Sequence, residues 1–234
     1  MIKQNTSHAV MSQRNPNMDT FDNFPTPPWA TRAFVESQLL GTNNLAASTC
    51  LEPACGQGYM SETLKEYFGA VSSFDILDYG YKDMEKKDFL RSGLQDNSFD
   101  WVITNPPFKI AEDFIFESLR VARVGVAMLV RTVFIESVGR YDRLFSQNPP
   151  TYFAQYVERV AMVKGRLDRK ASTATGYGWA VCTMGYPQLN NCAPRASLGI
   201  FGHKNTGQSR AILEFSIKNT PQNLLGCCFK WLRR

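Results

Sequence analysis

Short apolar runs alternate with amphipathic segments from residue 26 to residue 130. The apolar runs predict buried strands at about residues 48–52, 70–76, 101–104 and 124–130. The segments between them carry apolar side chains at helical spacing. Because strands and helices alternate, the chain is predicted to be an α/β protein with a mostly parallel sheet and helices on both faces.

Three helices are expected, one before the first of these strands and two between strands. The first follows Thr26, where a threonine cap and prolines in the first turn are typical of a helix start, and it ends at the break formed by residues 41–44. The second follows residue 58. The third covers about residues 111–123, with alanine, isoleucine and leucine side chains on one face.

The last third of the chain has a different pattern. Val157–Val163 and Trp179–Met184 are predicted to be two further strands, joined by residues 164–176. This connection, which we call the basic loop, is rich in Lys, Arg, Gly, Ser and Thr. A long connection of this kind between two strands carries function more often than it serves structure alone.

The length of 234 residues suits one large α/β domain, and the 44% hydrophobic and 12% aromatic content excludes a disordered protein. Residues 1–20 are polar and are interpreted as a flexible N-terminal arm. Residues 21–187 are interpreted as the folded domain. Residues 188–234 are predicted to form a C-terminal extension, whose structure the pattern leaves unclear.

Neither a membrane nor a metal partner is expected. No apolar run reaches the roughly 18–20 residues of a membrane span, and the N-terminus lacks the apolar core of a secretory signal. We therefore expect a cytoplasmic protein. The six cysteines form no Cys-x-x-Cys pair and are accompanied by only two histidines, so we expect reduced thiols and no metal.

The net charge of +5 is distributed unevenly along the chain. Residues 1–119 contain nine Lys and Arg against sixteen Asp and Glu, a net charge of −7. Residues 120–234 contain seventeen against five, a net charge of +12. Basic charge concentrated in one half of a chain favours a polyanionic partner, and nucleic acid is the partner we expect.

Residues 52–58, Glu-Pro-Ala-Cys-Gly-Gln-Gly, join a predicted strand to a predicted helix. We call residues 53–58 the glycine turn. Such a turn lets the backbone approach a nucleotide-like ligand at the edge of a sheet. It lacks the third Gly of the dinucleotide fingerprint, and no Lys-Ser/Thr pair follows to hold phosphates. Asp75 ends the next predicted strand, where an acid binds ribose hydroxyls or is simply a loop carboxylate.

Residues 105–108, Asn-Pro-Pro-Phe, directly follow another predicted buried strand, and we call them the catalytic turn. The side-chain oxygen of Asn105 and the carbonyl of Pro106 can both accept a hydrogen bond from one planar amino group, and Phe108 offers a ring face for stacking. A Pro-Pro pair is also an ordinary way to end a strand. The turn therefore acquires its meaning from the motifs that precede it.

Five motifs occur in an order that resembles the S-adenosylmethionine-dependent amino methyltransferases, especially the DNA adenine-N6 group and its small phage- and prophage-borne members. They are residues 24–29 (Phe-Pro-Thr-Pro-Pro-Trp), residues 52–58, Asp75, Asp88-Phe89 and residues 105–108. The resemblance covers roughly residues 21–185. It implies a Rossmann-like class I methyltransferase fold with a mostly parallel seven-stranded sheet, and S-adenosylmethionine as the cofactor.

The resemblance also implies a role for each matching residue. The residues matched to the cofactor are Thr26, Pro27 and Trp29 over its methionine end, Glu52, Ala54, Gly56 and Gly58 under its methionine and ribose, Asp75 at the ribose hydroxyls, Ile76 beside the adenine ring, and Asp88 and Phe89 at the adenine amino group and face. The residues matched to the catalytic motif are Asn105, Pro106, Pro107 and Phe108.

Six basic residues are candidates for contact with nucleic acid phosphates. They are Arg140, Arg143, Lys164, Arg166, Arg169 and Lys170. The alternative for the basic loop is an ordinary solvated loop. Larger members of the family carry a separate target-recognition domain, which this chain leaves little room for, so limited sequence specificity is expected.

Adenine N6 in DNA is the favoured substrate. RNA adenine or a protein glutamine is the alternative, because the catalytic turn suits any planar amine or amide. A non-catalytic relative that binds nucleic acid is the third possibility, although binding alone does not require the residues of the catalytic turn.

Overall fold

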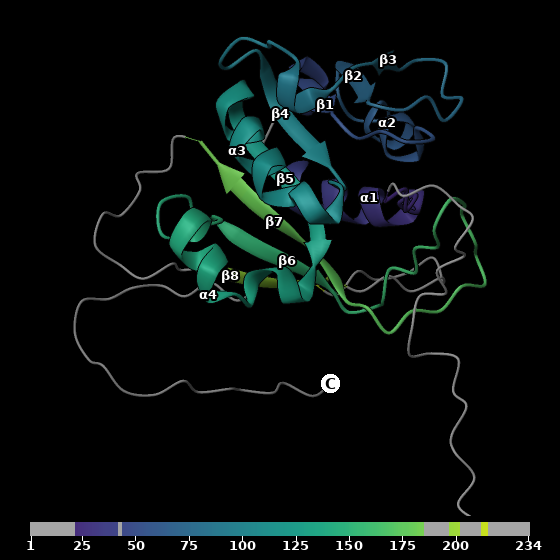
Figure 1. The fold of residues 1–234 in the computed structure, drawn as a ribbon. Coiled ribbons are helices and arrows are strands. Elements are labelled where there is room, and N and C mark those ends of the chain that lie inside the picture. The colour runs from purple at the N-terminus through teal and green to yellow at the C-terminus, as the bar shows by residue number, and fades with distance from the viewer. Residues whose placement is uncertain (1–21, 42–43, 185–196, 202–211, 215–234) are drawn as a thin grey trace, which may run out of the picture.

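The computed structural model describes residues 22–41, 44–184, 197–201 and 212–214. Within them the chain forms one mixed sheet in the order β3-β2-β1-β4-β5-β7-β6-β8-β9 (Figure 1). The strands are β1 (Thr49–Glu52), β2 (Ala70–Asp75), β3 (Glu85–Lys86), β4 (Phe99–Thr104), β5 (Ala122–Arg131), β6 (Tyr152–Tyr156), β7 (Tyr177–Thr183), β8 (Ser197–Phe201) and β9 (Ile212–Glu214).

The first five strands in this order are parallel to one another. β7 lies between β5 and β6 and is antiparallel to both. β8 is parallel to β6, and β9 is antiparallel to β8. The predicted α/β class and mostly parallel sheet are therefore confirmed, and two strands from the C-terminal part of the chain extend the sheet beyond the predicted seven.

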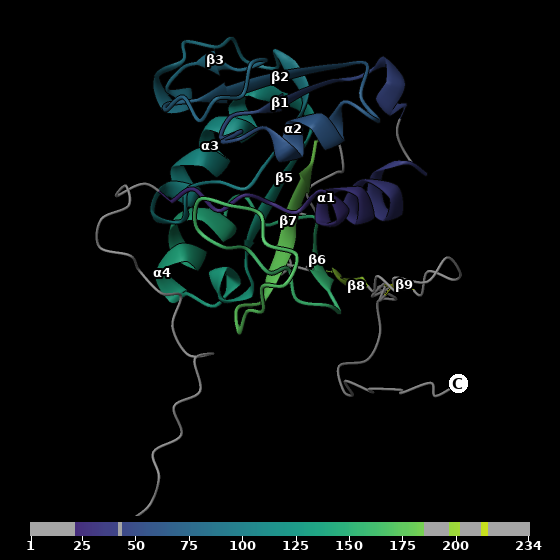
Figure 2. The ribbon, with the colours of Figure 1, turned by 90° about the vertical axis from the view of Figure 1, so that its right-hand side faces the viewer.

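Helices cover both faces of the sheet, as predicted (Figure 2). They are α1 (Pro28–Phe34), which continues as a π-helical turn over Val35–Leu39, α2 (Tyr59–Leu64), α3 (Ala111–Val121) and α4 (Val138–Arg140), which continues as a π-helical turn over Tyr141–Phe145. Alternate side chains of each strand point to opposite faces, so the sheet has two cores. Trp101 and Ile103 pack with α1 and α2, whereas Val102 packs with α3.

The predicted strand over Val157–Val163 was wrong. β6 ends at Tyr156, and residues 157–176 form one connection to β7. Val160 and Met162 are buried while their immediate neighbours are less so, which imitates the period of a strand. Among the described residues, however, the only bridge of this segment joins Val163 to Arg166. Both side chains are buried in the core that contains α1 and α2, without pairing in the sheet.

Trp179 belongs to the core, because its side chain is fully buried and stacks on Phe34 with ring centroids 4.2 Å apart. The predicted N-terminal arm lies outside the described residues, as does the predicted extension apart from β8 and β9. No helix in the described part of the chain is long and apolar enough to cross a bilayer.

Candidate active site

The carboxyl ends of β1, β2 and β4 meet at one edge of the sheet, where they border a pocket. In a parallel sheet this edge is where ligands bind, because loops and helix starts gather there. The pocket is lined by Asp22, Asn23, Phe24, Pro25, Thr26, Glu52, Ala54, Cys55, Gly56, Gln57, Tyr59, Met60, Asp75, Ile76, Tyr79, Asn105 and Pro107. Residues 22–26, which we call the N-terminal strap, form one side of the pocket.

Backbone conformation favours glycine at both glycine positions of the glycine turn, and lack of space adds a second reason at Gly58. Both have positive φ, +52° at Gly56 and +80° at Gly58, a backbone region that other residues rarely adopt. A Cβ at Gly58 would also lie 2.4 Å from the ring of Tyr81. That ring is held by the hydroxyl of Tyr81, which donates to Glu62 (2.6 Å), and Lys65 pairs with the same carboxylate (2.8 Å).

Asp75 ends β2 with its carboxylate facing the glycine turn. One of its oxygens accepts from the backbone N–H of Gly56 (2.9 Å), and the other accepts from that of Leu77 (3.0 Å). Each carboxylate oxygen has a second lone pair, so both can still accept from a ligand hydroxyl. Burial raises the pKa of Asp75, whereas the backbone N–H groups oppose that rise.

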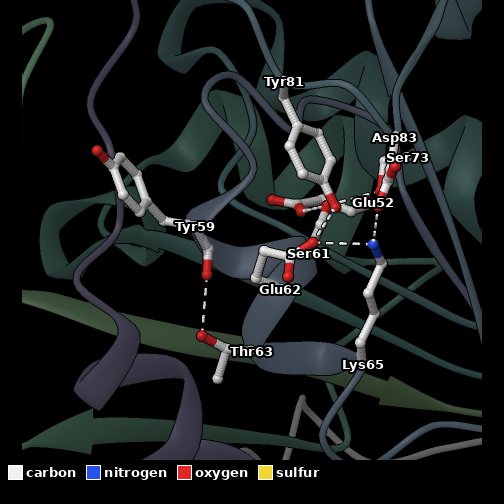
Figure 3. A network of polar contacts seen from close by, with 9 residues as sticks. All are labelled: Glu52, Tyr59, Ser61, Glu62, Thr63, Lys65, Ser73, Tyr81 and Asp83. Atoms are coloured by element: carbon white, nitrogen blue, oxygen red, sulfur yellow. Dashed lines mark hydrogen bonds and ion pairs between the residues drawn. The ribbon is translucent and has the colours of Figure 1, made fainter.

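Glu52 ends β1 and is 2% exposed, inside the same pocket. The hydroxyl of Ser61 donates to its carboxyl group, and the hydroxyl of Ser73 donates to Ser61 over 2.7 Å (Figure 3). Burial raises the pKa of Glu52 to about 8, despite the opposing hydrogen bond from Ser61. Glu52 is therefore protonated over much of the neutral range and ionises only when the site favours a negative charge.

Asn105, the first residue of the catalytic turn, lines the pocket. The side-chain nitrogen donates to the carbonyl of Phe24 (3.0 Å) and to the hydroxyl of Thr26 (3.2 Å), and it lies 3.6 Å from the sulfur of Met162. The side-chain oxygen is buried and accepts no hydrogen bond from any residue that the structure describes. Asn105 thus has an unused acceptor beside the glycine turn.

Phe108 stands at the edge of this arrangement in contact with three side chains. Its ring centroid lies 5.3 Å from that of Phe24 and 6.3 Å from that of Tyr177. The guanidinium carbon of Arg131, at the end of β5, lies 4.3 Å from the centre of the Phe108 ring. Arg131 covers the aromatic ring by a cation–π contact and is itself exposed to solvent.

The segment between β6 and β7 closes the site from the other side. The backbone N–H of Gly165 donates to the carbonyl of Asn23 (2.8 Å), and its carbonyl accepts from the side chain of Gln57 (3.1 Å). Gly165 therefore connects the basic loop to the N-terminal strap and to the glycine turn. Sequence reasoning missed Met162 and Gln57, because these contacts join residues 57 and 108 positions apart.

Several residues expected at the cofactor lie outside the pocket lining. Asp88 caps a short helical turn through the backbone of Leu90 (3.1 Å) and lies 3.8 Å from Arg91. Phe89 is 2% exposed and packs on Phe114. The remaining three do not line the pocket either: Pro27 and Trp29 follow the strap in the sequence, and Gly58 is the last residue of the glycine turn. Tyr59 and Tyr79 line it instead, and no sequence motif marks them.

The predicted phosphate-binding residues form two groups. Arg140 and Arg143 both pair with Glu112, each at 3.0 Å, so their charges are partly neutralised within the protein. In the basic loop, Arg166 pairs with Asp168 at 3.3 Å. Arg169 and Lys170 are exposed and form no ion pair with any described residue. The described residues contain no cluster of His, Cys, Asp and Glu that could hold a metal ion.

No protein-family model matches the sequence, and no curated protein matches it. Solved structures do. A proposed class I S-adenosylmethionine-dependent methyltransferase from Listeria monocytogenes is similar with a TM-score of 0.55 at 14% identity, over 79% of this chain and 68% of that one. A proposed RNA methyltransferase from Pyrococcus horikoshii is similar with a TM-score of 0.52 at 15% identity, over 72% and 93% of the two chains.

The modification subunit of a proposed type I restriction enzyme from Vibrio vulnificus has a TM-score of 0.55 at 15% identity, over 84% of this chain and 50% of that one. The present chain thus matches half the length of that subunit. At such low identities the likeness concerns the fold. The strand order, the antiparallel β7 and these similarities together show that the chain has the Rossmann-like fold of class I methyltransferases.

Proposed function

We propose that the protein transfers a methyl group from S-adenosylmethionine to an exocyclic amino nitrogen of a nucleobase, with adenine N6 in DNA as the favoured target. The observation that carries the proposal is the unused oxygen of Asn105. It is a buried acceptor without a partner among the described residues, and it lies at the same pocket as the glycine turn and Asp75. An acceptor left unpaired in this way is costly unless a ligand uses it.

The residues at the pocket suit S-adenosylmethionine. Gly56 adds no side chain to the pocket lining, and Asp75 retains lone pairs for ribose hydroxyls. Ile76 is 51% exposed at the pocket rim, where it can cover an adenine ring. When bound, the cofactor supplies a methyl group made electrophilic by the positive sulfur. A carboxylate at Glu52 would complement that positive charge, at a pH that its raised pKa sets.

The catalytic turn has the task of making a poor nucleophile reactive. The lone pair of an aromatic amino nitrogen is delocalised into the ring. Hydrogen bonds from both of its protons, to Asn105 Oδ1 and to the carbonyl of Pro106, favour a tetrahedral nitrogen whose lone pair points at the methyl carbon. S-adenosylmethionine held at this pocket would supply the methyl group and keep the electron pair of the broken S–C bond, and the amino nitrogen would lose one proton to water after forming its bond to the methyl carbon.

Two features favour nucleic acid over protein as the substrate. The chain from residue 120 onwards has a net charge of +12, and the basic loop is anchored at the pocket through Gly165. The similar solved structures described as a restriction-enzyme modification subunit and an RNA methyltransferase agree with this choice. A base in a duplex would first have to leave the stack, at a cost of a few kcal/mol.

The test is mass spectrometry of nucleosides from the DNA and RNA of a host that expresses the protein. We expect N6-methyladenine in DNA above the level of a host that expresses Asn105→Ala. That variant should bind S-adenosylmethionine with the wild-type Kd and lose at least about 100-fold in transfer rate. Methylation found in RNA or protein only would overturn the DNA assignment, and full activity of Asn105→Ala would overturn the mechanism.

A further inference from the structure

We infer that Thr26 and Met162 are positioning residues that determine which end of the Asn105 amide faces the substrate. The inference rests on the proposed function and deepens it, because it names two side chains outside the catalytic turn on which the reaction would depend. One belongs to the N-terminal strap and the other to the connection between β6 and β7, and they meet at Asn105 although 136 positions separate them.

The carbonyl of Phe24 fixes the orientation of the Asn105 amide. A backbone carbonyl can accept a hydrogen bond but cannot donate one. The end of the Asn105 amide that faces it at 3.0 Å must therefore be the nitrogen. Rotating the amide by half a turn would bring two oxygens together and would present an NH2 group to the pocket. Because the substrate amine also donates, the rotated amide could not hold it.

Thr26 and Met162 extend this preference. The thioether of Met162 carries no proton and can only accept. The hydroxyl of Thr26 donates to it over 3.8 Å, which leaves a lone pair of that hydroxyl to accept from Asn105 at 3.2 Å. The nitrogen of Asn105 is thus surrounded by acceptors alone: a carbonyl, a hydroxyl whose proton is committed elsewhere, and a thioether at 3.6 Å.

Both side chains are held firmly where they act. Thr26 is 4% exposed and Met162 is 9% exposed. Gly165, three residues after Met162, is tied to Asn23 in the strap and to Gln57 in the glycine turn. The two chain segments that carry Thr26 and Met162 are therefore bonded to each other as well as to Asn105, so the set of acceptors is preorganised.

The inference separates two roles for Thr26. A residue that only contacts the cofactor would change the Kd for S-adenosylmethionine. A residue that orients Asn105 would change kcat and leave that Kd nearly constant, because the amide contacts the substrate amine rather than the cofactor. The isosteric change Thr26→Val removes the hydroxyl and keeps the shape. Thr26→Ser restores the hydroxyl and serves as the matched control.

In the full-length protein, we expect Thr26→Val to lower kcat about 10-fold, the cost of one lost hydrogen bond at a buried group, with less than a twofold change in Kd. Thr26→Ser should keep kcat within about twofold of wild type. Met162→Leu removes the weaker acceptor at similar volume and should lower kcat by about two- to threefold. A wild-type kcat in Thr26→Val, or a loss confined to Kd, would overturn the inference.

A second measurement does not require activity. The side-chain NH2 protons of Asn105, assigned by comparison with Asn105→Ala in an NMR spectrum, should exchange slowly with water in the wild type and in Thr26→Ser. They should exchange faster in Thr26→Val, and equal exchange in all three would overturn the inference. If the wild type transferred no methyl group to DNA, RNA or protein, the proposed function would fail, and the exchange rates would still decide the orientation of Asn105.

Discussion

The two sides of the pocket are built from contacts of different range. On the side of the glycine turn, the hydrogen bonds of the two carboxyl groups join residues close in the sequence: Glu52 and Ser61 are nine positions apart, and Gly56 and Asp75 are nineteen apart. On the side of the catalytic turn they join distant segments, with Asn105 and Phe24 being 81 positions apart. The first side is one strand-turn-helix unit with its neighbouring strand, whereas the second exists only when three separate segments have assembled.

The two sides of the pocket should respond differently to substitutions. The glycine turn depends on backbone conformation and steric space, so that a single methyl group can disrupt it. The catalytic turn depends on the polarity of hydrogen bonds, so that an isosteric substitution can disrupt it while the shape is kept. Three predictions test the first side, its electrostatics and the loop that connects both sides.

Gly58→Ala is expected to have the largest effect. A Cβ at this position would lie 2.4 Å from the ring of Tyr81, and the backbone φ of +80° is one that residues other than glycine rarely adopt. We expect a loss of about 3 kcal/mol in the free energy of unfolding, from backbone strain and overpacking together, and at least a 10-fold weaker Kd for S-adenosylmethionine. Urea unfolding and calorimetry measure the two quantities.

Gly80→Ala is the matched control, because its φ of +85° is similar and nothing lies within 4 Å of the added Cβ. It should show the cost of strain alone, about 1 kcal/mol. If the two variants were equally destabilised, the ring of Tyr81 would not constrain the turn, and the steric account of this side would fail.

The contrast between the two sides also explains what the sequence could predict. Strands β1, β2, β4 and β5 could be predicted from the sequence, whereas the two-residue β3 could not. Gly56, Asp75 and Asn105 could be predicted to share one edge of the sheet, because each lies at the end of a buried strand and parallel strands align these ends. Met162 could not be predicted to reach Asn105, because nothing local marks a contact between residues 57 positions apart. At Val157–Val163, the alternate burial of Val160 and Met162 in the core imitated the period of a strand, although the segment does not pair in the sheet.

Glu52→Gln is expected to change how stability depends on pH. The pKa of Glu52 is about 8 in the folded protein, against an ordinary value of 4.5 in the unfolded chain. Between these two pH values the folded state therefore binds more protons than the unfolded state. The free energy of unfolding contributed by this group therefore falls as pH rises from about 4.5 to 8, by up to about 1.4 kcal/mol per pH unit. The glutamine variant can still accept from Ser61 and should lack this fall.

Urea unfolding at pH 5, 6, 7 and 8 measures the difference, which should grow with pH in favour of the variant and reach about 3 kcal/mol at pH 7. Glu62→Gln is the control from the same network, because Lys65 lowers the pKa of that exposed carboxylate. Its contribution is lost only as pH falls below about 4.5. Glu62→Gln should therefore be less stable than wild type by an amount that stays constant from pH 5 to pH 8. A constant difference between Glu52→Gln and wild type across this range would mean that Glu52 is ionised in the folded protein.

The smallest effect is expected in the basic loop, which connects the two sides through Gly165. Arg169 and Lys170 are exposed and without an ion pair among the described residues, whereas Arg143 pairs with Glu112. The double variant Arg169→Ala/Lys170→Ala should weaken DNA binding by about 10-fold near 0.1 M salt and reduce the slope of log K against log salt by about 2.

Arg143→Ala is the matched control for that measurement. It removes one positive charge that Glu112 already partly balances. The carboxylate of Glu112 stays paired with Arg140, so the variant adds little negative charge to the surface. The salt slope should therefore change by less than about 0.5. A reduction of about 1 in the slope for Arg143→Ala would equal the effect per charge of the loop variant. The nucleic acid would then contact the surface of α4 as well as the basic loop, and Gly165 would not be the link between the phosphate contacts and the pocket.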